Sequence, residues 1–154
     1  MDDYTVRPAT RDDLPAVLTV LAQNRATPQP YEPIVDVSGA QAATWGRMQA
    51  TADLTVYLAE ATDEPVGTAS LLAVPTLGYG CRPTAFIEPV VVAYAHRRRG
   101  IARLMLERAL ADAAGLGCHK VQLLSHKRHA DDGAHDLYRS VGFTAEAEGF
   151  RRYL

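Results

Sequence analysis

The residues of this chain that could do chemistry begin with a basic turn from His96 to Gly100, which reads HRRRG. The run before it, Ile87 to Val92, is apolar and rich in β-branched residues, which predicts a buried strand. After the turn, apolar residues recur from Ile101 to Ala109 at helical spacing. The order predicts a strand, a glycine-bearing turn and a helix N-terminus, where unpaired backbone N–H groups and the helix dipole favour an anion such as phosphate.

The residue types in the turn fit an anion. Gly100 permits unusual φ angles and a close backbone approach, and Ala102 keeps the next helical position small. Arg97, Arg98 and Arg99 raise the local positive potential. The ordinary alternative is a basic surface turn that binds nothing, and these residues alone leave it open.

Two motifs in this part of the chain resemble one protein family. Arg97 to Ala102 (RRRGIA) fits the R/Q-x-x-G-x-G/A acyl-CoA signature of the GCN5-related N-acetyltransferases, and Val90, Val91 and Val92 resemble that family's fourth strand. Ala134 to Phe143 (AHDLYRSVGF) resembles its A-x-x-L-Y-x-x-x-G-F segment. The motifs occur in order, with a strand-like KVQLL between them, and the resemblance covers most of the chain from Val66 onward.

The resemblance implies a fold and a set of acetyl-CoA contacts. The fold is α/β of the α+β type, with a single mixed, mostly antiparallel sheet of six to seven strands and about four helices. Two central parallel strands would splay apart and hold the pantetheine arm against Val90, Val91 and Val92. The implied contacts for the rest of the cofactor are Arg97, Arg98, Arg99, Gly100, Ile101, Ala102, Ser125 and Asp131. Asp131 stands where family members often have Asn, and it cannot donate a hydrogen bond when ionised.

Two side chains are candidates for the proton transfers of an acetylation, in which an amine loses a proton and a thiolate gains one. Glu88 interrupts the apolar strand, and a buried carboxylate has the raised pKa that suits a general base. Several family members carry Glu here in an I-E-D-V-x-V run, although Pro89 replaces the common Asp. Tyr138 matches the family tyrosine whose hydroxyl meets the CoA sulfur. The ordinary alternatives are a structural carboxylate and a packing tyrosine.

Periodicity and turn residues predict the remaining elements. Strands are expected at Tyr4–Pro8, Leu54–Ala61, Val66–Val74, Lys120–Leu124, Phe143–Glu148 and Phe150–Leu154, in addition to the strand before the turn. Helices are expected from Thr10 to about Gln23, from Ala40 to Ala50, from Ile101 to Gly115 and from Asp131 to Val141. No linker divides the chain, so residues 1–154 are expected to form one domain.

Two loops are candidates for contacting the acceptor substrate. Arg25 to Gly39 contains three prolines, and it is either a lid carrying Tyr31 and Glu32 or a variable connection. Pro75 to Pro83 is rich in Gly and Pro and carries Tyr79 and Arg82. The identity of the acceptor cannot be derived from either loop.

Composition narrows the class of protein. The formal net charge of the 154 residues is -2, which does not indicate a nucleic-acid binder. The sequence has no signal-peptide h-region and no apolar run approaching about 18 residues, so a cytoplasmic protein with no membrane span is expected. Cys81 and Cys118 are expected to be reduced. His126 and His129 have no third ligand at a sensible spacing, so no metal is expected.

These observations favour an acetyl-CoA-dependent N-acetyltransferase that acts on a primary amine of a small molecule or on a peptide or protein amino group. The first alternative is a non-catalytic acyl-CoA binding or sensing module on the same fold. A nucleotide phosphate-binding protein is a second alternative, but the G-x-x-x-x-G-K-[ST] and G-x-G-x-x-G patterns are absent. The resemblance also allows a homodimer.

Overall fold

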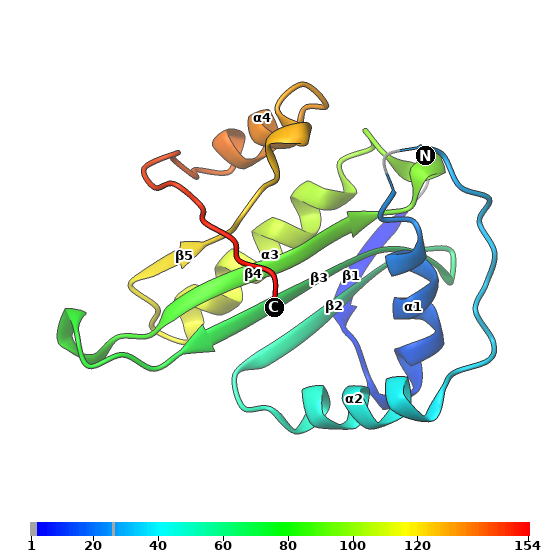
Figure 1. Ribbon diagram of the computed structural model, residues 1–154, viewed down its shortest axis with the longest axis horizontal. Coiled ribbons are helices and arrows are strands. Elements are labelled where there is room, and N and C mark those ends of the chain that lie inside the picture. Colours follow the sequence, from blue (N-terminus) through cyan, green and yellow to red (C-terminus); the bar gives the residue numbers. More distant parts are fainter. Residues whose placement is uncertain (1–2, 26) are drawn as a thin grey trace.

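The computed structural model describes residues 3–25 and 27–154 (Figure 1). Met1 and Asp2, at the terminus where no signal peptide is expected, lie outside the described residues, as does Ala26 in the predicted loop 25–39. The strands are β1 (Tyr4–Pro8), β2 (Leu54–Ala61), β3 (Glu64–Val74), β4 (Thr84–Val92) and β5 (Lys120–Gln122). The α-helices are α1 (Leu14–Ala22), α2 (Gly39–Ala50), α3 (Ile101–Gly115) and α4 (Ala134–Ser140).

The strands form one mixed sheet in the order β1-β2-β3-β4-β5. Neighbours from β1 to β4 pair antiparallel, and short connections join β2 to β3 and β3 to β4. β5 follows a crossover through α3 and pairs parallel to β4, from Thr84 opposite Lys120 to Phe86 opposite Gln122. A single, mostly antiparallel sheet with four flanking helices is therefore confirmed.

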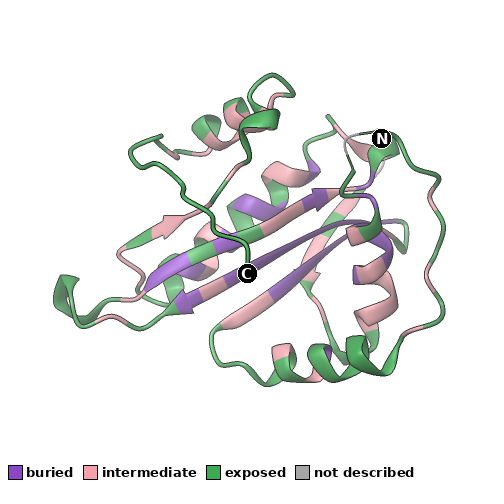
Figure 2. Ribbon diagram, viewed as in Figure 1, coloured by how far each residue is buried: buried purple, intermediate pink, exposed green. Residues whose placement is uncertain are grey.

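The alternation of β2 divides the core into two layers. Tyr57 and Ala59 pack against α3, whereas Val56 and Leu58 pack against Val17 of α1 and other residues of α1 and α2. Successive strand residues point to opposite faces, so α3 covers one face of the sheet and α1 and α2 cover the other (Figures 1 and 2). The face on which a side chain lies therefore determines from which side it reaches the gap between β4 and β5.

The expectation of six to seven strands is wrong. β5 ends at Gln122 rather than Leu124, and no strand follows α4 in the described part of the chain. The segments Phe143–Glu148 and Phe150–Leu154 have no strand neighbour, and the exposed fractions of Phe150 and Tyr153 are 87% and 86%. Local alternation favours a strand, but without a partner edge or a buried face nothing offsets the entropy of ordering it.

The start of α4 also differs from the prediction. The helix begins at Ala134 rather than Asp131, because Gly133 takes a left-handed φ of 85° immediately before it. The carboxylate of Asp132 accepts a hydrogen bond from the backbone N–H of Ala134 at 3.0 Å. The residues from 131 to 133 therefore form a turn, and Gly133 in it lies against Arg98 of the basic turn after β4.

Candidate active site

A gap opens between β4 and β5 beyond their three paired residues. No described strand pairs with Ile87–Val92 on the side of β5, because the chain diverges from β4 after Gln122 and leads towards α4 (Figure 1). Backbone N–H and C=O groups require partners, and an extended ligand with its own amides can supply them. Val90, Val91 and Val92, the predicted pantetheine contacts, lie along this unpaired stretch.

A β-bulge in β4 directs Glu88. In β3, Leu71 pairs with Ile87 and Ala69 pairs with Val90. Ser70, the one residue between Ala69 and Leu71, therefore stands opposite two residues of β4, Glu88 and Pro89. Ile87 and Val90 both pack on the side of α3, which leaves Glu88 on the face of α1 and α2. The expectation that Glu88 is buried is wrong, because the bulge places its side chain in an exposed position.

The basic turn ends in an uncapped helix N-terminus. Gly100 is the N-cap residue of α3 with a left-handed φ of 86°, and a Cβ at this position would meet no atom within 4 Å. Among the described residues, no group accepts a hydrogen bond from the backbone N–H of Ile101, Ala102 or Arg103. Three amides without described acceptors and the positive end of the helix dipole thus follow the basic turn, which is the arrangement that binds phosphate.

The arginines of the turn do different things. Arg97 donates to the backbone oxygens of Val92 at 3.2 Å and Gln23 at 3.0 Å, so its side chain holds the turn in place. Arg98 reaches across to α4, where a Cβ on Gly133 would overlap its guanidinium group. The absence of a side chain at Gly133 therefore allows the turn and α4 to lie together. Arg99 extends from the same turn as an exposed side chain.

Gln23, at the end of α1, positions the turn and was not found from the sequence. Its side chain is buried, with its amide nitrogen donating to Pro30 O at 3.0 Å and its amide oxygen accepting from Tyr94 N at 3.3 Å. Together with the bond from Arg97, these contacts tie α1 and the following loop to the residues before the turn. A glutamine at a helix end has no periodicity signal that distinguishes this role.

Tyr138 lies on α4, half-buried beside the layer that contains α3. Its ring meets Phe143 edge-to-face with centroids 6.2 Å apart, and no described residue makes a hydrogen bond with its hydroxyl. Burial, and then the charge of Asp132, raises the pKa of the Tyr138 hydroxyl, so the phenol keeps its proton at neutral pH. Tyr138 and Glu88 therefore lie on opposite faces of the sheet.

A Ser–His contact accompanies Tyr138. His135 Nε2 lies 3.1 Å from Ser125 Oγ, and His135 precedes Tyr138 by three residues, on the same side of α4. Ser125 was predicted as a cofactor contact, but His135 was missed because it occupies a variable position of the motif. The contact between Ser125 and His135 joins the segment after β5 to α4, the helix that carries Tyr138.

The turn before α4 uses Asp132 rather than the predicted Asp131. Asp131 is exposed, whereas Asp132 pairs with His129 and caps Ala134. Burial pushes the pKa of the Asp132 carboxyl upward, but the hydrogen bonds from His129 and Ala134 and the nearby positive charges lower it overall. The cofactor contact of Asp131 stays a prediction.

The four predicted acceptor contacts fall into two places. Tyr31 donates its hydroxyl to Pro65 O at 2.7 Å beside the β2–β3 turn, and burial, with the charge of Glu64, raises its pKa to about 12. Glu32 next to it is exposed. This part of the predicted lid is anchored to the end of the sheet where the basic turn lies.

Tyr79 and Arg82 lie at the opposite end of β3. Tyr79 stacks on His119 with centroids 3.9 Å apart, and Arg82 donates to Gly117 O at 3.1 Å and to Cys118 O at 2.9 Å. The 11 residues of β3 separate the two places, at a rise of about 3.3 Å per residue. The structure therefore does not bring the two loops together around one small acceptor.

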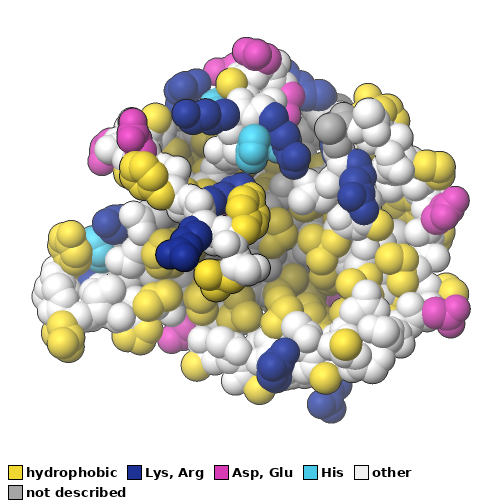
Figure 3. Space-filling view, in the orientation of Figure 1, with side chains coloured by type: hydrophobic (Ala, Val, Ile, Leu, Met, Phe, Trp, Pro, Cys, Tyr) yellow, Lys and Arg dark blue, Asp and Glu magenta, His cyan; other side chains and the backbone are white. Residues whose placement is uncertain are grey.

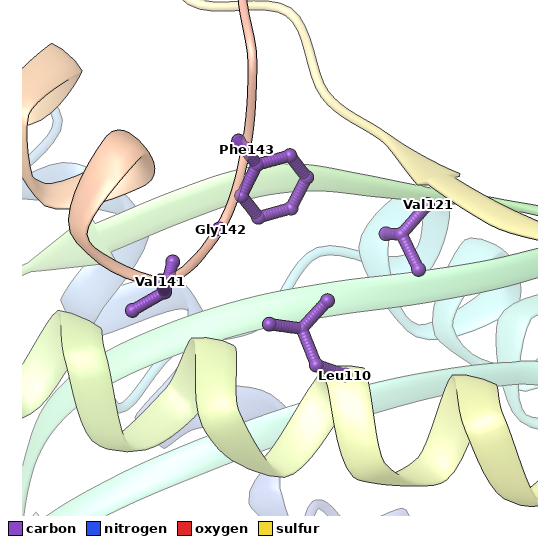
Figure 4. Close-up of a pocket in the computed structure, with 5 residues that line it drawn as sticks. All are labelled: Leu110, Val121, Val141, Gly142 and Phe143. Carbon is purple, nitrogen blue, oxygen red and sulfur yellow. The ribbon is translucent and has the colours of Figure 1, made fainter.

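One small pocket lies beside the Phe143 ring that packs on Tyr138. It has a volume of about 170 Å³ and is lined by Leu110, Val121, Val141, Gly142 and Phe143 (Figure 4). Leu110, Val121 and Phe143 point towards one another from α3, β5 and the chain after α4. The pocket is a gap in the packing of α4 against the sheet and contains none of the predicted site residues.

The described part of the chain contains no cluster of three or more His, Cys, Asp or Glu side chains arranged to hold a metal. His126 accepts a hydrogen bond from Arg128 N at 3.0 Å. Cys81 and Cys118 are free cysteines. No helix among the described residues has both the length and the apolar character needed to span a membrane.

Comparison with solved structures gives matches that cover nearly all of this chain. A candidate acetyltransferase from Agrobacterium tumefaciens shares 36% identity with a TM-score of 0.83, over 97% of this chain and 99% of that one. A Bacillus halodurans protein described as a transcriptional regulator shares 26% identity with a TM-score of 0.84, over 99% and 100%. An aminoglycoside N-acetyltransferase in complex with CoA has the same fold at 18% identity, with a TM-score of 0.76 over 99% and 96%.

A search of curated proteins gave no match. The model of the acetyltransferase (GNAT) family matches residues 22–143, which include the gap between β4 and β5, the basic turn and Tyr138. This family uses acetyl-CoA. The match covers well over half of the sequence and agrees with both motifs and with the uncapped N-terminus of α3, so the chain belongs to the GNAT acetyltransferase family.

Proposed function

We propose that this chain is an acetyl-CoA-dependent N-acetyltransferase. It transfers the acetyl group to a primary amine of a small molecule, or to a peptide or protein amino group, by direct attack in a ternary complex. The observation that carries the proposal is the uncapped N-terminus of α3 at the end of the unpaired stretch of β4. A ligand that carries both a pyrophosphate and an amide-bearing arm would provide acceptors for the amides of the helix N-terminus and partners for the unpaired backbone of β4.

The residues present fit the co-substrate. The amides of Ile101, Ala102 and Arg103 would hold the pyrophosphate, with Arg98 and Arg99 supplying positive charge. The backbone of Val90–Val92 would pair with the pantetheine arm, and Ser125 and Asp131 would contact it from the side of β5 and α4. Acetyl-CoA supplies the activated acetyl thioester.

The two candidate catalytic groups have separate roles. Glu88, on the face of α1 and α2, accepts the proton that the amine must lose before or during its attack. Tyr138, on the face of α3, donates its proton to the departing thiolate, and its raised pKa keeps that proton available. The acceptor and the thiol would thus lie on opposite sides of the reacting carbonyl, which suits direct transfer.

The non-catalytic alternative has one observation in its favour. The Bacillus halodurans relative, at 26% identity over the full chain, is described as a transcriptional regulator rather than as an enzyme. A module of that kind would bind acyl-CoA through the same turn without using Glu88 or Tyr138. Turnover therefore separates the two functions, whereas CoA binding does not.

The test is a screen of amines with released CoA as the readout, preceded by a calorimetric titration with CoA. We expect CoA to bind and at least one class of primary amine to release CoA at a rate that saturates with amine concentration. CoA binding without amine-dependent release would favour the binding module. Failure to bind CoA at all would contradict both functions.

A further inference from the structure

A second, larger pocket lies between α1 and α2, on the face of the sheet shown in Figure 3. Its volume is about 330 Å³, within the range of small-molecule sites. Leu14, Val17, Leu18 and Leu21 line it from α1, and Trp45 and Met48 line it from α2. Apolar side chains gather at the centre of this face in Figure 3. None of the residues proposed above to act in acetyl transfer belongs to this lining.

The pocket is suited to an uncharged group. Its lining contains no charged side chain, and its two polar residues, Gln41 and Thr44, are already hydrogen-bonded. Gln41 accepts from Ser38 N at 2.9 Å, and Thr44 accepts from the guanidinium of Arg47 at 3.2 Å. An ammonium group inside would lose its hydration and gain no counter-charge, which is costly. An alkyl or aromatic group would replace water along these side chains favourably.

The pocket and Glu88 share a face of the sheet. Val17 and Trp45 pack on β2 through Val56 and Leu58, which defines the face covered by α1 and α2. The bulge in β4 places Glu88 on that same face. An acceptor whose amine meets Glu88 therefore approaches from the side on which the apolar pocket lies.

We infer that this pocket binds the apolar body of the acceptor, so that the acceptor is a primary amine carrying an alkyl or aromatic group rather than a polycation. This inference rests on the proposed N-acetyltransferase function. The uncharged lining selects the apolar body, and the amine stays outside the pocket at the exposed carboxylate of Glu88.

The first test is a series of n-alkylamines from propylamine to octylamine. Each methylene that enters the pocket should raise kcat/KM about fourfold, which corresponds to about 0.8 kcal/mol per buried CH₂. The increase should stop once the chain fills the pocket. Equal kcat/KM along the series, or a preference for spermidine over hexylamine, would overturn the inference.

A pair of variants on α2 localises the effect. Thr44→Phe places a ring at the mouth of the pocket, whereas Ala43→Phe places the same ring on an exposed neighbouring position outside the lining. Thr44→Phe should abolish the dependence on chain length and leave CoA affinity unchanged. Ala43→Phe should keep both. A chain-length dependence that survives in Thr44→Phe would show that the alkyl group binds elsewhere.

Trp45 provides a readout that needs no turnover. It is the only tryptophan in the chain, its side chain is 4% exposed, and it lines the pocket. Hexylamine should change its fluorescence saturably in the wild type and in Ala43→Phe, and ethylamine should do so only at far higher concentration. If no amine is acetylated, the proposed function fails. The fluorescence titration then still tests whether the pocket binds the alkyl group. A Trp45 emission spectrum that hexylamine leaves unchanged would overturn the inference that the pocket binds the apolar body of the acceptor.

Discussion

At the scale of the residue, the Tyr138 hydroxyl is the group whose removal should affect chemistry most selectively. Tyr138→Phe keeps the ring that packs on Phe143 and removes only the proton donor. In the proposed mechanism the hydroxyl acts on charge that develops at the leaving thiolate, so kcat should fall by on the order of 100-fold while CoA affinity stays unchanged. Steady-state kinetics with a CoA titration measures both. Wild-type turnover in the Phe variant would show that Tyr138 only packs.

Glu88 makes a second residue-scale prediction. Glu88→Gln keeps the size of the side chain but cannot accept a proton, so kcat/KM at neutral pH should fall while CoA binding persists. Raising the pH deprotonates the amine without help and should recover activity. Glu107→Gln is the matched control, since Glu107 is also exposed but lies on α3, which covers the other face of the sheet. A fully active Glu88→Gln enzyme would place the base elsewhere.

The places of these residues in the fold could be predicted from the sequence only in part. Tyr138 and Gly100 lie in contiguous motifs, and the structure places Tyr138 facing the layer of α3 and Gly100 at the helix N-terminus. The burial of Glu88 was predicted wrongly because a one-residue bulge is invisible to the apolar pattern of a strand. His135 and Gln23 act through contacts with distant residues, 10 positions away in the chain for His135 with Ser125 and 71 for Gln23 with Tyr94.

At the scale of the element, the N-terminus of α3 makes the sharpest prediction. Ala102→Glu puts a carboxylate in the first turn of α3, where the positive end of the helix dipole stabilises a negative charge, so the fold should keep its stability. The same charge repels a pyrophosphate, so CoA affinity should fall at least about tenfold, and less at high salt. Ala102→Gln, of equal size and no charge, should retain most of the affinity. Calorimetry and thermal denaturation measure the two effects.

Gly100→Val tests the same helix end through its backbone. Valine strains a φ of 86°, so the turn should shift and CoA affinity should drop even though a Cβ there meets no atom within 4 Å. Gly46→Val, within α2 and also without close neighbours, controls for the general cost of the substitution. Undiminished CoA affinity in a folded Gly100→Val protein would contradict the assignment of the pyrophosphate.

The start of α1 is fixed by an ionic cluster that depends on pH. Arg7 bonds to Asp13 at 2.7 Å and to Glu60 at 2.8 Å, and Asp13 also accepts from Thr10 N. The hydrogen bond from Arg7 dominates the environment of Asp13 and lowers its pKa to about 2. A carboxyl with a depressed folded pKa stabilises the fold above its unfolded pKa of about 3.9, and that stability is lost as the pH falls towards 2.

Asp13→Asn should therefore lower the free energy of unfolding at pH 7 by on the order of 1 kcal/mol, since Arg7 is partly exposed and solvent screens the pair. The difference from the wild type should shrink between about pH 4 and pH 2. Asp12→Asn, an exposed neighbour, should change little. Urea denaturation across this pH range measures the effect, and a difference independent of pH would assign it to something other than the ion pair.

The elements themselves were predicted unevenly. Helices and strands with a long periodic pattern, such as α3, β2 and β3, appear within one or two residues of the prediction. The C-terminal strands do not form, because strand formation there depends on a neighbouring edge that local alternation cannot report. α4 starts late because Gly133 takes a left-handed φ of 85° before it. A Cβ on Gly133 would overlap Arg98, which is far away in sequence, and no local rule includes such a contact.

At the scale of the whole molecule, the proposed catalytic groups lie on the two faces of the sheet. Glu88 and the pocket between α1 and α2 lie on one face, and Tyr138 lies on the other, with the gap between β4 and β5 connecting them. In the proposed arrangement the acceptor amine approaches the thioester carbonyl of acetyl-CoA from the face of Glu88, and Tyr138 meets the departing sulfur from the other face. Transfer then needs no acetylated enzyme, and this is the central claim of the proposed mechanism.

Mass spectrometry of a quenched single turnover tests that claim most directly. Enzyme in excess is mixed with acetyl-CoA and hexylamine, and the protein, the released CoA and the acetylated amine are quantified from the same quench. We predict N-acetylhexylamine and CoA in a one-to-one ratio at every time point, with the protein mass unchanged. CoA release without acetylated amine, or an acetyl group that appears first on the protein, would contradict direct transfer to the amine.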